Sequence, residues 1–232
     1  MAEFGTLPLR SDANVQAYYK LENVNDDLGV NNLTNNNTAT FEAAKYGNGV
    51  SGGSSDADKS LTIANRLGYT GGAYAMSFWV RIITEPGSGV QYQFCSVTDD
   101  TTSNSRLTIF YNNNAGTREI YSVRTKVGTG DENGTPYAVD LGTSVLHHVV
   151  LSYDGSTVKL YLDNVERQSY SASGNGATDT TNKFSILEGF TANGDSTLGI
   201  IDDFVPLDRA LTVPEIASIY AEGTSGLHAK YW

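Results

Sequence analysis

The clearest chemical signal in the chain is a pair of neighbouring carboxylates, Asp202 and Asp203, inside an apolar run between Ile201 and Phe204. Successive side chains of a β-strand point to opposite faces of the sheet, so we expect the two aspartates to face opposite sides. A buried carboxylate without a partner is energetically costly, and it needs hydrogen-bond donors, a cation or a sheet edge. Two interpretations therefore stay open for Asp202: a cation ligand, or an acceptor of backbone N–H groups.

The other residues that could do chemistry are isolated from one another along the chain. Glu188 has no second acid at a matching spacing, whereas glycoside hydrolysis usually needs two carboxylates about 5–9.5 Å apart. His147 and His148 are adjacent, so a strand would point them to opposite faces. Cys95 lies in an alternating apolar run without a local base to activate its thiol. The sequence therefore predicts a protein that is not an enzyme.

Composition excludes several classes of partner. The 232 residues carry a formal net charge of −11, with 39% hydrophobic and 18% charged residues. A negative charge of this size repels phosphate backbones and anionic membranes, so we expect no nucleic-acid partner. Membrane insertion is not expected either, because no apolar stretch reaches the roughly 18 residues of a membrane span. Cations are the natural small partners of such a surface.

The pattern of apolar residues predicts an all-β fold. About ten short segments alternate between apolar and polar residues, are rich in β-branched and aromatic types, and are separated by turn residues. A single helix is expected at 212–223, where Thr212 and Glu215 have the spacing of a capping box and Gly223 can end the helix. No internal repeat or domain break interrupts the pattern. It indicates a two-sheet antiparallel sandwich of jelly-roll type with one short C-terminal helix.

Four motifs, in this order along the chain, resemble the laminin-G-like and pentraxin-like family. They are YYKLENVNDDLGVNNLTNNN, AYAMSFWVR, LHHVVLSYDGSTVKLYLDN and IDDFVPLDRALTVPEI. The resemblance implies a concanavalin A-like jelly-roll domain over residues 11–225, with residues 1–10 as a leader or vector-derived remnant and 226–232 as a tail. The chain departs from the family pattern at Leu146, which replaces the usual Trp, and at Asn164, which replaces the usual Gly.

The resemblance also implies a structural calcium ion. Members of the family often hold calcium with an Asp of the closing strand and with oxygens from the opening segment. Asp202 matches the closing-strand position, and Asp26 or Asp27 would contribute from the opening segment. Calcium takes six to eight oxygen ligands, many of them carbonyls and waters, so two carboxylates can suffice. The acidic loops at 98–102 and 130–135 are further candidates, or are simply solvated turns.

Ligand recognition in the family uses the concave sheet or the rim loops, and its ligands are glycans or other proteins. Tyr111, Arg124 and Tyr161 are the candidate outward contacts of this chain, and Trp79 and Arg81 share one face of their strand. Aromatic rings stack on sugars, and polar groups bond their hydroxyls. The alternative is that these residues make ordinary cross-strand pairs.

Together these features predict a non-catalytic, lectin-like carbohydrate-binding module with a structural calcium ion. Its partner would be a glycan or polysaccharide, and its location extracellular or at a cell surface, although the chain has no export signal. One alternative is a protein-interaction or adhesion domain of a surface or viral structural protein. Another is a divergent glycoside hydrolase or polysaccharide lyase, for which the known strand motifs of glucanases and alginate lyases are missing.

Overall fold

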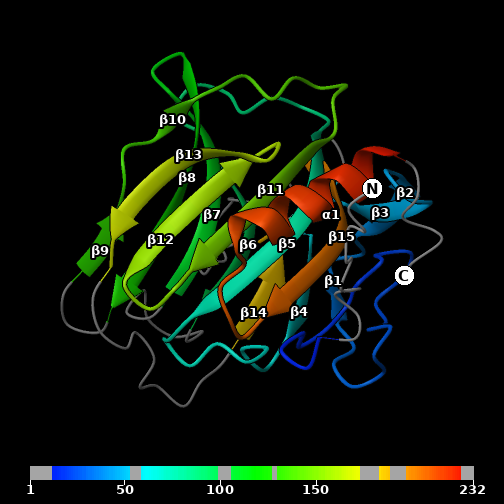
Figure 1. Ribbon diagram of the computed structural model, residues 1–232. Coiled ribbons are helices and arrows are strands. Elements are labelled where there is room, and N and C mark those ends of the chain that lie inside the picture. Colours follow the sequence, from blue (N-terminus) through cyan, green and yellow to red (C-terminus); the bar gives the residue numbers. More distant parts are fainter. Residues whose placement is uncertain are drawn as a thin grey trace.

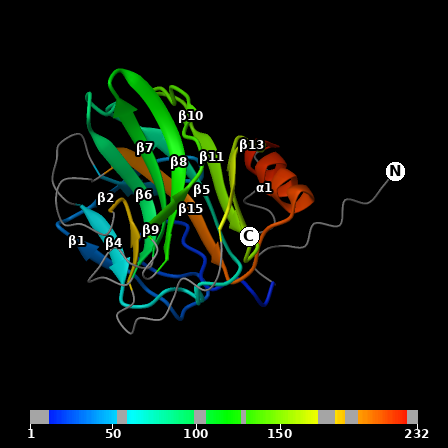
Figure 2. The ribbon, with the colours of Figure 1, turned by 90° about the vertical axis from the view of Figure 1, so that its left-hand side faces the viewer.

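The computed structural model describes residues 12–52, 59–98, 106–126, 130–172, 183–188 and 197–225. Within these ranges, antiparallel strands form two sheets that pack face to face, and one helix lies outside them (Figures 1 and 2). The two-sheet β-sandwich predicted from the alternating pattern is confirmed. The expected leader, the tail and most of the acidic loop at 98–102 lie outside the described residues.

The strands divide between an eight-stranded and a seven-stranded sheet. The first has the order β1 (Thr34–Asn36), β4 (Ser60–Ile63), β14 (Lys183–Ile186), β6 (Gln91–Thr98), β7 (Arg106–Asn114), β8 (Thr117–Lys126) and β10 (Tyr137–Ala138), with β9 (Gly130–Asn133) also on β8. The second has the order β13 (Val165–Ser171), β12 (Thr157–Leu162), β11 (His147–Tyr153), β5 (Tyr74–Ile82), β15 (Gly199–Leu207), β3 (Asn48–Ser51) and β2 (Thr40–Ala43).

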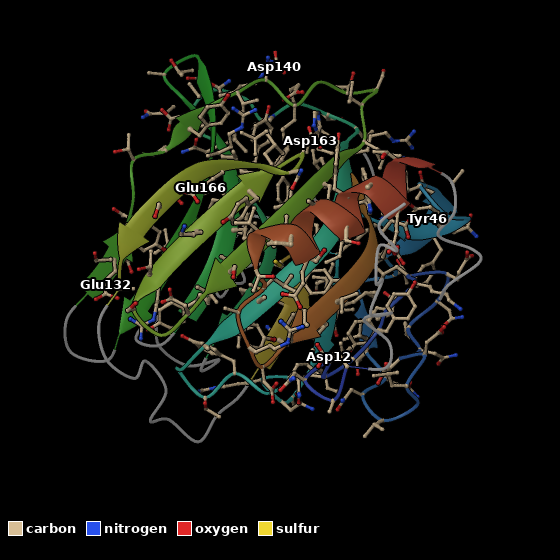
Figure 3. All side chains as sticks on the ribbon, viewed as in Figure 1. Asp12, Tyr46, Glu132, Asp140, Asp163 and Glu166 are labelled. Atoms are coloured by element: carbon tan, nitrogen blue, oxygen red, sulfur yellow. The ribbon has the colours of Figure 1, made fainter. Side chains whose placement is uncertain are left out.

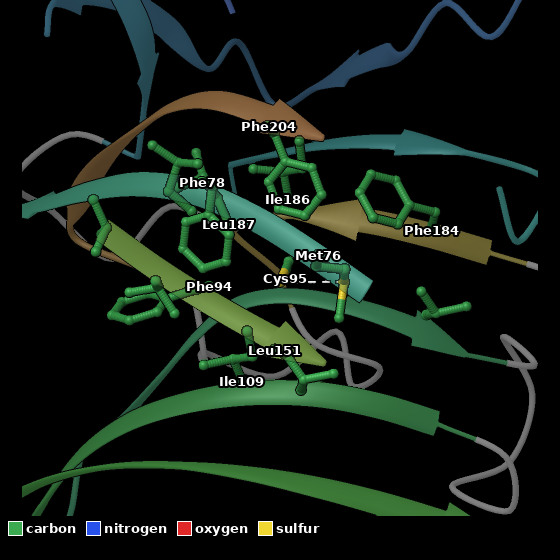
Figure 4. Packing of buried hydrophobic residues seen from close by; sticks show 14 of the residues in the cluster. Met76, Phe78, Phe94, Cys95, Ile109, Leu151, Phe184, Ile186, Leu187 and Phe204 are labelled. Carbon is green, nitrogen blue, oxygen red and sulfur yellow. Dashed lines mark hydrogen bonds between the residues drawn. The ribbon is translucent and has the colours of Figure 1, made fainter. Parts of the chain in front are cut away.

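The main core lies between the two sheets, where the apolar members of each alternating strand meet (Figure 4). Phe78 of β5 stacks on Phe204 of β15 with ring centroids 5.1 Å apart. Cys95 is fully buried there, with its Sγ 3.8 Å from the Sδ of Met76. Burial raises the pKa of the Cys95 thiol well above its usual value, so the thiol stays protonated and serves packing.

A second apolar cluster lies on the outer face of the seven-stranded sheet, under the helix α1 (Val213–Ser225) (Figure 2). One half of the predicted capping box is present, because the backbone N–H of Thr212 donates to Glu215 at 2.7 Å; the Thr212 hydroxyl also donates to this carboxylate, at 2.7 Å. Gly223 does not end the helix, which continues to Ser225. It lies in the last turn against the sheet, where an added Cβ would approach the Cζ2 of Trp79 to 2.2 Å.

The opening segment of the chain pairs with the closing strand, β15. Val15 forms an isolated bridge with Leu207, and Tyr19 forms one with Phe204. Asp12 forms an ion pair with Arg209, just beyond β15, and it lies below the start of the helix (Figure 3). The expected meeting of opening segment and closing strand is therefore confirmed.

The closing strand contains a β-bulge at the acidic pair. The register of β15 on β5 shifts between Asp202 and Val205, and Asp203 has a φ of 57°. Ile201 and Phe204 both enter the main core, although residues three apart point to opposite faces of a regular strand. The expectation that the aspartates face opposite sides was therefore wrong, because the inserted residue puts both on the outer side of the sheet.

Candidate functional site

The first candidate site is the acidic pair at the bulge. Asp202 is fully buried, and its Oδ2 accepts a hydrogen bond of 2.8 Å from the backbone N–H of Tyr46. Its Oδ1 is also buried and has no hydrogen-bond partner among the described residues. Burial, followed by repulsion from Asp203, raises the pKa of Asp202 to about 8. At neutral pH this carboxyl group therefore binds a proton or needs a compensating cation.

Three segments far apart in the sequence meet around the pair. The hydroxyl of Tyr18, in the opening segment, donates to Oδ1 of Asp203 at 2.6 Å. Tyr46 lies beside the C-terminal end of α1, and its hydroxyl donates to the carbonyl of Gly223 at 2.6 Å (Figure 3). Burial and the charge of Asp203 raise the pKa of Tyr18, so its hydroxyl remains a donor. The pair thus connects the opening segment, the turn at 44–47 and the helix.

The two predicted partners of Asp202 are engaged elsewhere. Asp26 accepts backbone N–H groups with both oxygens, including that of Tyr18 at 2.8 Å and that of Leu28 at 2.9 Å, and so organises the 26–31 loop. Asp27 forms an ion pair of 2.5 Å with Lys20. In the described part of the chain, no three His, Cys, Asp or Glu side chains gather in a way that could hold a metal ion.

The predicted ligand contacts on the seven-stranded sheet are mostly covered. Trp79 and Arg81 share the outer face as expected, but Trp79 is only 3% exposed and stacks on Tyr220 of α1 with centroids 6.0 Å apart. Tyr161 also points outward, yet it is 4% exposed within the apolar cluster under the helix. Arg81 donates to the carbonyl of Ala43 at 3.2 Å. Of these three, only Arg81 is more than slightly accessible.

Tyr111 and Arg124 point into the sandwich, so the expectation that they face outward was wrong. Tyr111 is fully buried and stacks on Phe94 of the main core with ring centroids 6.2 Å apart. Arg124 is fully buried, pairs with Glu132 at 2.5 Å, and lies 4.8 Å from the ring centroid of Tyr153. Both strands present the neighbouring positions outward instead, because side chains alternate along a strand.

These outward positions form the second candidate site, on the outer face of the eight-stranded sheet. Phe110 of β7 and Tyr121 of β8 are opposite each other in the register, and their rings stack at 5.2 Å. Phe110 is only 3% exposed, whereas Tyr121 is partly exposed, so Tyr121 presents the accessible ring of the pair. Gln91 of β6 donates to the Tyr121 hydroxyl and is opposite Asn112 of β7. We call these four residues the aromatic–amide platform.

Two polar atoms at the platform lack a hydrogen-bond partner. The Oδ1 atom of Asn112 and the hydroxyl of Thr108, which is two residues along β7 from Phe110, are buried without a partner in the described structure. Buried polar groups are usually hydrogen-bonded, and each exception requires an explanation. Both atoms are buried, so a ligand cannot reach them directly. The groups that the platform presents belong to the partly exposed residues Tyr121, Gln91 and Asn112, whose ring and amide groups are suitable for contacts with sugars.

The two histidines occupy separate environments, as expected from their adjacent positions. Burial lowers the pKa of His148 to about 3, so this residue is neutral, and its Nε2 lies 2.9 Å from the hydroxyl of Ser77. The Nδ1 of His147 lies 2.7 Å from Asp163, and its Nε2 lies 2.9 Å from the carbonyl of Leu141. Both ring nitrogens of His147 are therefore occupied by structural contacts.

Comparisons with known proteins support the architecture. Domain 4 of AbnA, a GH43 extracellular arabinanase from Geobacillus stearothermophilus in complex with arabinotriose, is similar with a TM-score of 0.67 and 16% identity, over 89% of this chain and 98% of that one. The binding domain of botulinum neurotoxin DC in complex with SialylT has a TM-score of 0.71 and 12% identity, over 91% of this chain. The binding domain of Paraclostridial Mosquitocidal Protein 1 has a TM-score of 0.70 and 14% identity, over 89% of this chain.

The chain spans about half of each toxin binding domain, 52% in both cases. A comparison with curated proteins gave no match. Within the described residues, α1 is too short and too polar to cross a membrane. The family model for the concanavalin A-like lectin/glucanases superfamily matches residues 52–217, most of the chain. The sequence match and the sandwich agree, and the chain belongs to the concanavalin A-like lectin/glucanase superfamily.

Proposed function

We propose that the chain is a non-catalytic carbohydrate-binding module that contacts its glycan through the aromatic–amide platform. The observation that carries this proposal is the partly exposed ring of Tyr121, which stacks on the buried Phe110 and lies beside the amide groups of Gln91 and Asn112. Aromatic faces stack on the apolar side of sugar rings, while amide groups bond hydroxyls. The arrangement thus offers both types of contact on one face.

The similar structures are consistent with this proposal. The arabinanase domain was solved with arabinotriose, and a toxin binding domain with SialylT. The binding domain of botulinum neurotoxin DC was also solved with rat synaptotagmin II, so a protein partner is the competing outcome. An extracellular or surface location follows from the proposal, because polysaccharides and surface glycans are the targets of such modules.

A binding experiment with Tyr121→Ala tests the proposal. A glycan array screened with the full chain identifies a ligand, and calorimetry then compares the variants. Loss of the Tyr121 ring should weaken binding by about threefold to tenfold, because an aromatic stacking contact contributes roughly 0.5–1.5 kcal/mol. Tyr137→Ala on β10 is the matched control, since Tyr137 is also a partly buried tyrosine of this sheet but is not part of the platform. Equal losses in the two variants, or no glycan binding by the wild type, would reject the proposal.

We also propose that a calcium ion binds at the acidic pair, held by Asp202 and Asp203. The observation that supports this site is the buried Oδ1 of Asp202, which has no hydrogen-bond donor among the described residues and lies beside a second carboxylate. Calcium favours carboxylate oxygens and completes its shell with carbonyls and waters. When bound, the ion supplies positive charge that compensates the pair. Asp26 then serves the 26–31 loop rather than the ion, because its oxygens accept backbone N–H groups.

A further inference from the structure

The charges around the aromatic–amide platform are mostly negative. Glu119 of β8 is opposite Asn112 in the register and extends the row of Gln91 and Asn112 across the sheet. Near the same end of β8, Arg118 pairs with two carboxylates, Glu85 at 3.2 Å and Asp140 at 2.5 Å. The described side chains beside the platform therefore carry more carboxylates than cations.

The cationic side chains that the structure describes on this sheet pair with carboxylates: Arg118 as above, and the buried Arg124 with Glu132. Lys183 of β14 pairs with Glu188 at 3.7 Å. The segments that separate the described ranges add no cation: together, residues 53–58, 99–105, 127–129, 173–182 and 189–196 contain Asp56, Asp58, Asp99, Asp100, Asp179 and Asp195 but no Lys or Arg.

The excess of negative charge near the platform disfavours ligands that carry a carboxylate. Carboxylates of sialic or uronic acids are recognised by charge-assisted hydrogen bonds, most often from Arg or Lys. A sugar carboxylate at the platform would instead meet Glu119 and the field of a chain with a formal charge of −11. An uncharged sugar needs only ring stacking and hydroxyl contacts, and the platform provides groups for both.

We infer that the platform selects uncharged glycans and discriminates against sialylated and uronic-acid glycans. This inference rests on the proposed carbohydrate-binding function, and it names the class of ligand for the same face. The toxin binding domain that was solved with SialylT has a similar fold, but the inference predicts that this chain disfavours sialylated glycans.

The experiment uses the full chain and a matched pair of glycans that differ by one acidic sugar, lactose and sialyllactose. Binding is measured at 0.02 M and 1 M salt. The neutral member should bind at least tenfold more tightly at low salt, and the ratio should shrink at 1 M, where the Debye length is about 3 Å. An acidic member that binds equally or better would overturn the inference while leaving the proposed function intact. Failure of all glycans to bind would reject the proposed function, and the inference with it.

A substitution of Glu119 tests whether its carboxylate disfavours acidic glycans. At low salt, Glu119→Gln should reduce the ratio of the neutral to the acidic glycan's affinity several-fold. The affinity of the neutral glycan should stay unchanged. Glu166→Gln is the matched control, because Glu166 lies on β13 of the other sheet and pairs with Lys159 at 3.0 Å. An unchanged affinity ratio in Glu119→Gln, or the same change of this ratio in both variants, would contradict the inference.

Discussion

The most informative perturbation is Asp202→Asn, which removes one negative charge from the bulge with little change in shape. The carboxamide oxygen can still accept the N–H group of Tyr46, so the contact with the 44–47 turn is retained. What changes is the cost of ionising a buried acid next to Asp203. This variant therefore separates the electrostatic role of Asp202 from its role in holding the turn.

The magnitude follows from the pKa, which rises from 3.8 to about 8 in the folded protein. Each pKa unit corresponds to about 1.4 kcal/mol, so ionising Asp202 costs on the order of 6 kcal/mol before the surroundings relax. Because the folded pKa is raised, the cation-free protein loses stability as the pH rises from about 4 to about 8. In chelator at pH 8, Asp202→Asn should therefore melt at a higher temperature than the wild type.

Calcium should reverse the order of the melting temperatures of the wild type and Asp202→Asn. At 100 times its dissociation constant, a ligand stabilises the folded state by about 2.7 kcal/mol. For a chain of this size, 1 kcal/mol corresponds to about 2–4 °C, so calcium should raise the Tm of the wild type by about 5–10 °C. Asp202→Asn should lose most of this increase. Scanning calorimetry in EDTA and in calcium, at pH 5 and pH 8, measures all of these values.

The matched control is Asp27→Asn in the opening segment. Asp27 pairs with Lys20 at the surface, so this change should leave the calcium-dependent increase in Tm intact. Equal melting temperatures of the wild type in calcium and in EDTA would refute the calcium site. Loss of the increase in Asp27→Asn, but not in Asp202→Asn, would show that the opening segment binds the ion instead.

Two further predictions concern other buried contacts. Burial lowers the pKa of His147, but hydrogen bonds to Asp163 and to the Leu141 carbonyl raise it more, so the net pKa lies above 6.5. The stabilisation from protonated His147 is full below pH 6.5 and is lost as the pH rises through the folded pKa. His147→Ala should therefore flatten this part of a plot of Tm against pH. An unchanged slope in the variant would contradict this prediction. Gly223→Ala should lower the Tm although alanine favours helices, because the added Cβ would meet Trp79. Ala221→Gly, at an exposed helix position, controls for helix propensity. A higher Tm in Gly223→Ala would refute the contact.

Much of the fold could be predicted because its signals are local. The resemblance of the LHHVVLSYDGSTVKLYLDN motif to the family implies that Val158, Leu160 and Leu162 of β12 face the core, and all three are buried there. The spacing of Thr212 and Glu215 predicts the start of the helix, which the structure confirms. These features depend on residues that are close in the sequence, so the printed chain contains the relevant information.

The sites were harder to predict because they depend on register. Pro206 follows the bulge in β15, but no glycine occupies the positive-φ position at Asp203, and an aspartate can adopt a positive φ without leaving an obvious sequence signal. Phe110 and Tyr111 are adjacent aromatic residues, so the sequence alone does not show which one faces outward. Only the pairing of β7 with β8 puts Phe110 beside Tyr121. The unsatisfied oxygen of Asp202 likewise depends on packing that the sequence does not report.

The position of the helix has a practical consequence for attachment. Asp12 is held against Arg209 near the start of α1, and α1 ends at Ser225 on the outer side of the seven-stranded sheet (Figures 2 and 3). Polypeptide joined directly at Asp12 or at Ser225 would therefore be attached on the side opposite the eight-stranded sheet. A fusion partner or a solid support linked at either point would leave the opposite face turned toward incoming molecules.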